Sequence, residues 1–362
     1  MNTRELVVGL DNGGTTNNVT VLELATGRFL VDGLYEFPSE VRLGPDVAID
    51  ALVRAFTAAV DYVGGSADQV AAVGLDSPGP ASANGVISSR GSTNFVHPGW
   101  RGFDLRSALE MRLDLPVVYN NDGNAAALYA HHALYGADAN EHDSVSVVIG
   151  TGLGGGIVHR GRVVTGAAGM AGELGHVHIP MDGLLESDQP IPSCNCGFSG
   201  DAEALASLTG IERNLLPYWL TRFPDHPLAA LDPHEAARAV RGYGEDGDPL
   251  ARAVFHQQAA AVGLLFTIVS NLLDPDVYFV GGGVVEAREE FRDWFLDEVR
   301  AHMHLREEQA SAATLRLVPD LDTAGARGSA LAASDLAASL RGGPHQALRE
   351  TGARSEPRRG LP

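Results

Sequence analysis

Apolar runs that suit buried strands alternate along most of this chain with longer stretches in which apolar residues recur at helical spacing. Runs bounded by glycine-rich or polar turns predict strands at residues 5–10, 19–24, 29–31, 70–75, 116–119, 145–149, 277–280 and 315–318. Helical periodicity predicts helices at residues 47–63, 105–113, 121–135, 201–216, 233–241, 249–273, 286–303 and 324–340. Strands and helices that alternate in this way indicate an α/β fold.

One pattern occurs twice in the chain. A strand, a glycine-rich turn and a second strand follow one another at residues 5–24 and again at residues 145–164. The repetition suggests a duplicated α/β domain with a nucleotide between the two halves. A length of 362 residues likewise favours two domains of ordinary size.

The amino-acid composition excludes some classes of chemistry and of binding partner. The chain has a net charge of −20 and contains no lysine, which excludes both Schiff-base lysine chemistry and a GxxxxGK[ST] phosphate loop. Because an acidic surface repels phosphate backbones and anionic membranes, we expect neither nucleic acid nor a membrane as a partner. The chain runs straight into its first strand without a basic and apolar leader, and no apolar run of membrane-spanning length is predicted, so we expect a cytoplasmic protein.

Glycine-rich turns follow three predicted strands, at Asp11–Thr16, Gly150–Gly156 and Gly281–Gly283. Glycines let successive backbone N–H groups face a phosphate, threonines add hydroxyl donors, and an acidic residue at a strand end can hold Mg²⁺ through water. The second turn is not a dinucleotide-binding fingerprint, because a strand follows it instead of a helix. Any one of these segments could be an ordinary turn, but three at strand ends predict a nucleotide site.

These turns and several further motifs resemble those of the ROK family (repressor, open reading frame, kinase) within the actin-like ATPase superfamily. The motifs are LDNGGTT, DSPGPA, NNDGNAAA, GTGLGGG, GELGH, CNCGFSGDAE and NLLDPDVYFVGGG. The resemblance runs from about residue 6 to about residue 337. It implies two actin-like (ribonuclease H-like) α/β domains hinged around a central cleft, one at residues 1–121 completed by the helix 324–340, the other at residues 122–323. Residues 341–362, rich in Arg, Gly and Pro, are predicted to be a disordered tail.

The resemblance also implies that ATP and Mg²⁺ lie against the glycine-rich turns and that a sugar binds deep between the domains. The residues expected at the nucleotide are Asp11, Gly13, Gly14, Thr15, Thr151, Gly152, Gly154 and Gly282.

Asp122, in the motif NNDGN, is expected to be the catalytic base. A lone Asp between a strand and a helix could be a helix cap, but the family places the base in this motif. A sugar hydroxyl is a weak nucleophile, and a carboxylate within reach can take its proton as the phosphoryl group arrives. The residues expected at the sugar are Gly79, Asn94, Asn121, Glu173, His176 and Glu203. His178 would point away from His176 in an extended segment and is expected to be structural.

The cysteine motif predicts a zinc site with one unusual ligand. A disulfide between Cys194 and Cys196 would be strained, so reduced thiols are expected. Many ROK proteins hold a structural zinc with the histidine of the GELGH motif and three cysteines of CxCGxxGC, and here Asp201 stands in place of the third cysteine. His176, Cys194, Cys196 and Asp201 could still bind zinc, with loss of the metal as the alternative. Residues 181–193, longer than in typical members, could form a lid or an ordinary loop.

The favoured function is ATP-dependent phosphorylation of a hexose, with glucose to glucose 6-phosphate as the leading reaction. N-acetylmannosamine, N-acetylglucosamine, fructose and allose stay open as acceptors. Polyphosphate stays open as the donor, although the cysteine motif favours ATP. A repressor of this family would carry a helix-turn-helix domain before the first turn, where only ten residues precede Asp11, and a non-catalytic sugar sensor would not need to retain Asp122. We also expect a homodimer or a homotetramer.

Overall fold

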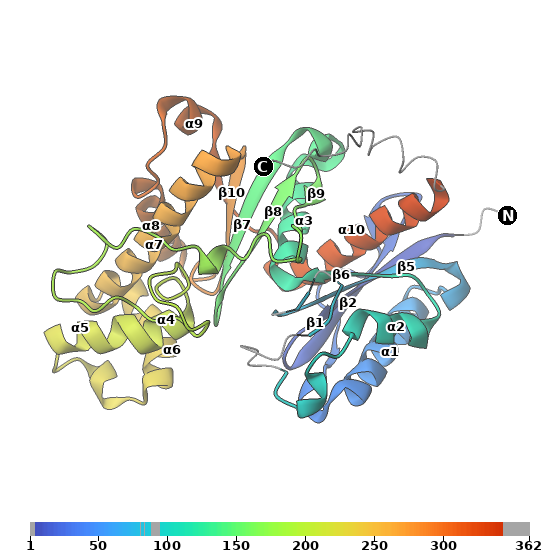
Figure 1. The fold of residues 1–362 in the computed structure, drawn as a ribbon, viewed down its shortest axis with the longest axis horizontal. Helices are drawn as coiled ribbons and strands as arrows, with labels where there is room; N and C mark the ends of the chain where they lie inside the picture. Colours follow the sequence, from blue (N-terminus) through green and yellow to red (C-terminus); the bar gives the residue numbers. More distant parts are fainter. Residues whose placement is uncertain (1–3, 80, 83, 88–94, 343–362) are drawn as a thin grey trace, which may run out of the picture.

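The computed structural model describes residues 4–79, 81–82, 84–87 and 95–342, and it consists of two lobes, each built around one β-sheet (Figure 1). Asn94, expected at the sugar, and residues 343–362, which make up nearly all of the predicted tail, lie outside the described residues.

The first sheet has the strand order β3-β2-β1-β5-β6. Its strands are β1 (Leu6–Asn12), β2 (Thr16–Glu23), β3 (Arg28–Phe29), β5 (Val70–Ser77) and β6 (Val117–Asn121), with β4 (Glu36–Pro38) pairing with β2. The first three strands form an antiparallel meander, and β5 and β6 continue the sheet parallel to β1.

The second sheet repeats this arrangement with the order β9-β8-β7-β10-β11. Its strands are β7 (Asp143–Ile149), β8 (Leu153–His159), β9 (Arg162–Val163), β10 (Val277–Gly282) and β11 (Thr314–Leu317). Again an antiparallel meander comes first and two parallel strands follow. The shared order confirms the duplication that the repeated strand–turn–strand pattern predicted.

Helices cover both faces of both sheets, and two of them lie between the lobes. The helices are α1 (Pro45–Tyr62), α2 (Leu105–Leu113), α3 (Asp122–Tyr135), α4 (Leu208–Gly210), α5 (Leu216–Arg222), α6 (Pro233–Glu245), α7 (Pro249–Leu273), α8 (Glu289–Ala301), α9 (Glu307–Ala312) and α10 (Leu321–Gly342). Helices α1 and α2 pack on the outer face of the first sheet, and α4 to α8 pack on the outer face of the second (Figure 1). Helix α10 packs on the inner face of the first sheet, α3 packs on the second, and the two helices pack on each other.

Glycines bring α10 into backbone contact with the first sheet and with α3. A β-carbon on Gly9 would lie 2.0 Å from the carbonyl oxygen of Ala326, and one on Gly74 would lie 1.8 Å from that of Ser329. A β-carbon on Gly328 would lie 1.8 Å from the carbonyl oxygen of Ala125 in α3. Larger residues at these glycines would push α10 away from the strand ends that carry the candidate site.

Most predicted elements form, but the predicted helix 201–216 does not begin where its periodicity suggested. Asp201 forms an isolated β-bridge with His178, and residues 202–207 are turns and bends. Helix α4 begins at Leu208, a π-helical turn follows at Ile211–Leu215, and α5 continues to Arg222. The N–H groups of Ala202 and Glu203 donate to the carbonyl oxygens of Val177 and Gly175 rather than within a helix. The short β4 and α9 were not predicted.

The sequence predicted no apolar run of membrane-spanning length, but helix α7 has that length. By length and composition alone it could cross a membrane, and 72 % of its most apolar stretch is buried inside the protein. Its apolar residues pack in the core of the second lobe against α5, α6 and α8. The lobe's core therefore accounts for the apolar composition.

Candidate active site

Three carboxylates meet at the carboxyl ends of β1, β5 and β6. Parallel pairing places Asp11 of β1 directly beside Asp76 of β5, and Asp122 begins α3 immediately after β6. Asp76 is fully buried, whereas Asp11 and Asp122 are half-buried. The sequence predicted roles for Asp11 and Asp122 but none for Asp76.

Helix α10 contacts Asp11 and Asp76. The hydroxyl of Ser329 donates a hydrogen bond of 2.7 Å to Oδ2 of Asp76, and a β-carbon on Gly325 would lie 2.9 Å from Cγ of Asp11. No described group donates a hydrogen bond to the other carboxylate oxygen, Oδ1, and the carboxyl of Asp11 lies within hydrogen-bond reach of Asp76. Two adjacent carboxylates of which one is fully buried require a shared proton or a cation between them.

The electrostatic setting separates Asp122 from an ordinary surface acid. Burial raises the pKa of Asp76, and the neighbouring Asp11 carboxylate raises it further. Burial raises the pKa of Asp122 to about 7; the carboxylates of Asp11 and Glu173 add to this rise, and the N–H of Gly123 opposes it. A carboxyl group with this pKa can accept a proton near neutral pH and release it again.

The sequence left open that Asp122 is only a helix cap. In the structure the neighbouring Asn121 caps the helix. Oδ1 of Asn121 accepts a hydrogen bond of 2.8 Å from the N–H of Gly123, as the N-cap of α3. Oδ1 of Asp122 accepts from the same N–H at 2.7 Å, which orients the carboxylate. Because Asn121 already caps the helix, capping alone does not explain Asp122.

Side chains expected at the sugar lie next to Asp122. A β-carbon on Gly79 would lie 3.1 Å from Nδ2 of Asn121 and 4.0 Å from Oε1 of Glu173. Burial raises the pKa of Glu173. Three segments of the chain, one of which holds both Asn121 and Asp122, thus present an amide and two carboxylates, which are suitable partners for several hydroxyl groups.

The two turns expected at the phosphates are closed by their own backbone. In the first, the N–H of Gly13 donates to the carbonyl oxygen of Thr16 at 2.9 Å, and Gly14 and Thr15 remain accessible. In the second, the N–H of Gly150 donates to the carbonyl oxygen of Gly152 at 2.9 Å.

Two other glycines of the second motif, Gly155 and Gly156, allow close packing against α3. A β-carbon on Gly123 would lie 2.5 Å from the carbonyl oxygen of Gly155, and one on Gly156 would lie 2.5 Å from Cβ of Ala127. Gly154 pairs with Val148 in the hairpin of β7 and β8. The glycines therefore let the start of α3, which carries Asp122, approach the backbone of β8.

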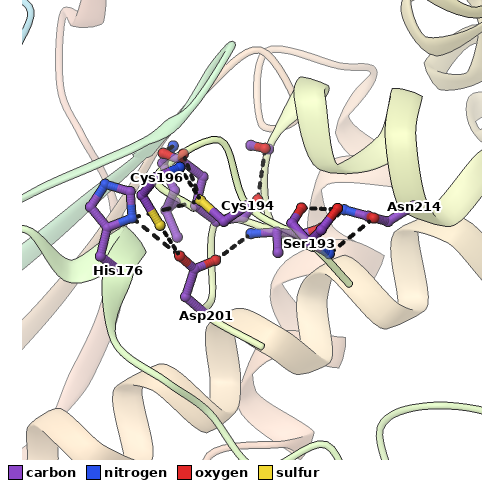
Figure 2. A network of polar contacts seen from close by, with 10 residues as sticks. His176, Ser193, Cys194, Cys196, Asp201 and Asn214 are labelled. Carbon is purple, nitrogen blue, oxygen red and sulfur yellow. Dashed lines mark hydrogen bonds and ion pairs between the residues drawn. The ribbon is translucent and has the colours of Figure 1, made fainter. Parts of the chain in front are cut away.

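Four potential metal ligands gather beyond β8, and Figure 2 shows the imidazole, both sulfur atoms and a carboxylate turned toward one another. Nδ1 of His176 lies 3.2 Å from Oδ2 of Asp201 and 3.8 Å from Sγ of Cys194, and Sγ of Cys196 lies 3.3 Å from the same Oδ2. A tetrahedral zinc with bonds of about 2.0–2.3 Å separates its ligand atoms by about 3.3–3.8 Å. All four candidate ligand atoms lie within 4.8 Å of one another, and Oδ2 of Asp201 is the fourth of them.

The cysteine loop is anchored from both sides. The side chain of Asn214, in the π-helical turn, accepts from the N–H of Ser193 and donates to the carbonyl oxygens of Ser193 and Ala204 (Figure 2). Gln189, in the segment 181–193 that the sequence left as a lid or a loop, exchanges hydrogen bonds with Gln257 of α7. These contacts fix the segment as a loop packed on the second lobe.

Glu203 links the cluster of candidate metal ligands to the turn expected at the phosphates. Its Oε2 accepts from the N–H of Leu153 at 2.9 Å, and its Oε1 lies 3.5 Å from Sγ of Cys194. His176 uses Nδ1 for the cluster, which leaves Nε2 on the opposite side of the ring for a further partner. The cluster thus positions two of the side chains expected at the sugar.

Gly282, expected near the adenosine, is also required by the backbone conformation and packing at this position. Its φ is +102°, and a β-carbon would lie 2.1 Å from the carbonyl oxygen of Ile149. Only glycine fits where β10 passes the end of β7 at this angle. The next residue, Gly283, lines a cavity that also reaches Gly150 and Thr151.

Sequence reasoning missed Asp76, Ser329 and Asn214. Asp76 stands in the motif DSPGPA, where its position opposite Asp11 depends on which strands pair. The other two belong to helical segments distant in sequence, and their partners could be found only from the fold. The signal available for Asp76 was an acid at the end of an otherwise apolar strand.

Comparisons of the sequence and of the structure with known proteins point to the same family. A model of the ROK family matches residues 7–335. A glucokinase of Halalkalibacterium halodurans is 32 % identical over 299 residues, which cover 82 % of this chain and 84 % of that protein. The crystal structure of a ROK hexokinase from Thermus thermophilus has a TM-score of 0.71 and 32 % identity, covering 93 % of this chain and 100 % of the other. A ROK family glucokinase from Streptomyces griseus, in complex with glucose and AMPPNP, has a TM-score of 0.64 and 28 % identity, covering 91 % and 99 %.

Proposed function

The chain belongs to the ROK family, and on that basis we propose that it is an ATP-dependent hexose kinase that phosphorylates glucose, with Asp122 as the general base. Glucokinases are 29–32 % identical to it over most of its length, and one ROK glucokinase of the same fold binds glucose and AMPPNP. The observation that carries the proposal is Asp122, whose pKa is raised to about 7 by burial. It lies beside the carboxylates of Asp11 and Glu173, between the phosphate turns and the polar groups that suit a sugar.

The reaction needs little covalent participation by the protein. The sugar hydroxyl oxygen bonds to the γ-phosphorus of ATP, the bond from that phosphorus to the bridging oxygen breaks, and ADP leaves with the bond's electron pair. The hydroxyl proton passes to the carboxylate of Asp122. Asn121, Glu173 and Nε2 of His176 would hold the sugar so that this hydroxyl faces Asp122.

The carboxylates of Asp11 and Asp76 are the groups that would hold Mg²⁺. They fit a hard divalent cation, because the two carboxylates lie side by side at the ends of β1 and β5 and both offer oxygen ligands. When bound, Mg²⁺ neutralises charge on the phosphates of ATP. Ser329 keeps Oδ2 of Asp76 engaged in a hydrogen bond.

Replacing Asp76 tests this cation site. Asp76→Asn keeps an acceptor for Ser329 but removes one anionic ligand, so we expect the apparent affinity for Mg²⁺ to fall by about tenfold. The direct measurement is Mn²⁺ binding by electron paramagnetic resonance in the presence of glucose and AMPPNP. Ser329→Ala is the matched control with both carboxylates retained, and a smaller loss is expected there. Unchanged Mn²⁺ affinity in Asp76→Asn would remove Asp76 from the site.

The zinc proposal concerns structure rather than chemistry. His176, Cys194, Cys196 and Asp201 would hold one Zn²⁺, which would fix the loop that carries Glu203 beside the second phosphate turn. No step of the phosphoryl transfer passes through it. The homodimer or homotetramer and the cytoplasmic location stay predictions.

A panel of sugars tests the substrate. With Mg-ATP in a coupled ADP-release assay, we expect glucose to give the highest kcat/KM among glucose, N-acetylglucosamine, N-acetylmannosamine, fructose and allose. Nuclear magnetic resonance of the product should show phosphate on O6. A strong preference for an N-acetyl sugar would replace the glucose assignment while keeping the kinase. Sugar binding without any ADP release would favour the sensor alternative.

A further inference from the structure

A buried pair of hydroxyl groups lies behind the strand ends that carry the candidate site. The hydroxyl of Tyr119 in β6 lies 2.8 Å from Oγ of Ser77 in β5, and either group can be the donor. Ser77 is fully buried and Tyr119 is 7 % exposed. In the parallel pairing of these strands Tyr119 lies beside Leu75, and Ser77 lies beside Asn121. The tyrosine side chain therefore runs along the sheet, from the interior of β6 toward the ends of both strands.

Ser77 is the last residue of β5 and begins the segment 77–79, which ends at a glycine expected at the sugar. A β-carbon on Gly79 would lie 3.1 Å from Nδ2 of Asn121 and 4.0 Å from Oε1 of Glu173. Because Oδ1 of Asn121 caps α3, Nδ2 is the part of this amide that faces Gly79. The position of the segment 77–79 therefore sets the space beside an amide and a carboxylate that are expected to hold the sugar.

The aromatic ring of Tyr119 is held by the packed core of the first lobe. It belongs to the apolar cluster between the sheet and helices α1 and α2. A β-carbon on Gly85, whose φ is +79°, would lie 3.0 Å from two atoms of the ring. A ring in a closely packed core has little freedom to move, so the hydroxyl at its end is a fixed point to which Ser77 is bonded.

The tyrosine hydroxyl also lies within electrostatic reach of the reacting groups. Burial raises the pKa of Tyr119, the hydrogen bond with Ser77 opposes the rise, and the carboxylates of Asp122, Asp76 and Glu173 add to it. The hydroxyl therefore keeps its proton at neutral pH. It can serve as a hydrogen-bonding group near the site, but not as an acid or a base in the reaction.

We propose that Tyr119 is a positioning residue for the acceptor sugar, and that its hydroxyl acts through Ser77 to fix the segment 77–79 against Asn121. The inference rests on the proposed kinase function and adds a residue that acts through another to that site. Without the tyrosine hydroxyl, Ser77 would keep a buried hydroxyl that has lost this partner. The segment 77–79 would then leave the position that suits the sugar, while the glycine-rich turns expected at the phosphates would stay as they are.

Tyr119→Phe tests this role, because it removes the hydroxyl and keeps the ring in the core. The KM for glucose should rise about three- to tenfold, whereas kcat and the KM for ATP should stay within about twofold of the wild type. The coupled assay measures these constants, and calorimetry measures the glucose dissociation constant. A purely structural role would lower the thermal midpoint without separating the two KM values.

Tyr278→Phe is the matched control. The hydroxyl of Tyr278 in β10 lies 2.6 Å from Oγ of Ser270 in α7, and both residues are buried in the second lobe. This variant also removes one buried tyrosine hydroxyl that is bonded to a serine. Its thermal midpoint should fall by about as much as that of Tyr119→Phe, but its KM for glucose should match that of the wild type.

A double variant tests whether Tyr119 acts through Ser77. Ser77→Ala should raise the KM for glucose about as much as Tyr119→Phe, and the combination should add no further rise, because both substitutions break one interaction. An unchanged glucose KM in Tyr119→Phe, an equal rise in Tyr278→Phe, or effects that multiply in the double variant would overturn the assignment. Absence of sugar phosphorylation by the wild type would instead contradict the proposed function itself.

Discussion

Asp122→Asn should reduce kcat by about a thousandfold while glucose still binds. The amide has nearly the shape of the carboxylate and retains an oxygen for the N–H of Gly123, so α3 and its Asn121 cap should persist. It cannot take the proton of the sugar hydroxyl at neutral pH. The measurements are single-turnover phosphorylation for the chemical step and calorimetry for the glucose dissociation constant.

The control for this variant is Asp76→Asn, which removes one carboxylate from the same cluster. High Mg²⁺ should restore much of the activity of Asp76→Asn, because its expected defect is cation affinity, and should not restore Asp122→Asn. Near-normal turnover in Asp122→Asn would contradict the base assignment. An equal rescue of both variants by Mg²⁺ would reduce Asp122 to a cation ligand.

Asp122→Asn should also raise the free energy of unfolding, and the size of this gain should depend on pH. The pKa of Asp122 lies at about 7 in the folded state, above its ordinary value of 3.8, so the folded protein binds more protons than the unfolded protein between these values. The free energy of unfolding therefore falls as pH rises through this window. Asp122→Asn lacks this loss, so its thermal midpoint should exceed that of the wild type by more at pH 8 than at pH 5.

Asp201→Asn should lose the zinc and with it the support for the second phosphate turn. Oδ1 of Asp201 accepts from the N–H of Ala204 at 3.0 Å, and asparagine can keep that contact while its neutral amide makes a poor zinc ligand. We expect less than stoichiometric zinc, a lower thermal midpoint and at least about a tenfold loss of kcat/KM. Elemental analysis, thermal denaturation and the coupled assay measure the three effects.

Asp201→Cys is the matched variant, because it restores a third thiolate. It should bind zinc at least as tightly as the wild type and resist chelators for longer. Full activity of wild-type protein that contains no zinc would show that the aspartate has ended the metal site. Stoichiometric zinc in Asp201→Asn would show that Asp201 is not a ligand.

The sequence predicted much of the fold because its local signals agree with the tertiary structure. The helices at residues 105–113 and 249–273 form with the bounds that their periodicity indicated. The repeated strand–turn–strand pattern correctly indicated two sheets of one design. The segment after Asp201 failed as a helix because its backbone N–H groups bond to residues 175–177, a tertiary contact that periodicity does not report.

The site was predicted where a motif keeps its residues together in sequence, and missed where the fold brings them together. Asn121 and Asp122 belong to one short motif at a strand end. Asp76 acquires a role only because β5 pairs with β1 and because Ser329, 253 residues later, reaches it from α10.

The pH dependence of glucose phosphorylation tests the central claim, that a buried Asp122 is the base. Because the base must be ionised, kcat/KM should be constant above neutral pH and fall about tenfold per pH unit below an apparent pKa of about 7. The residual activity of Asp122→Asn should lack this limb. A wild-type profile that stays level down to pH 5, or the same limb in Asp122→Asn, would contradict the account.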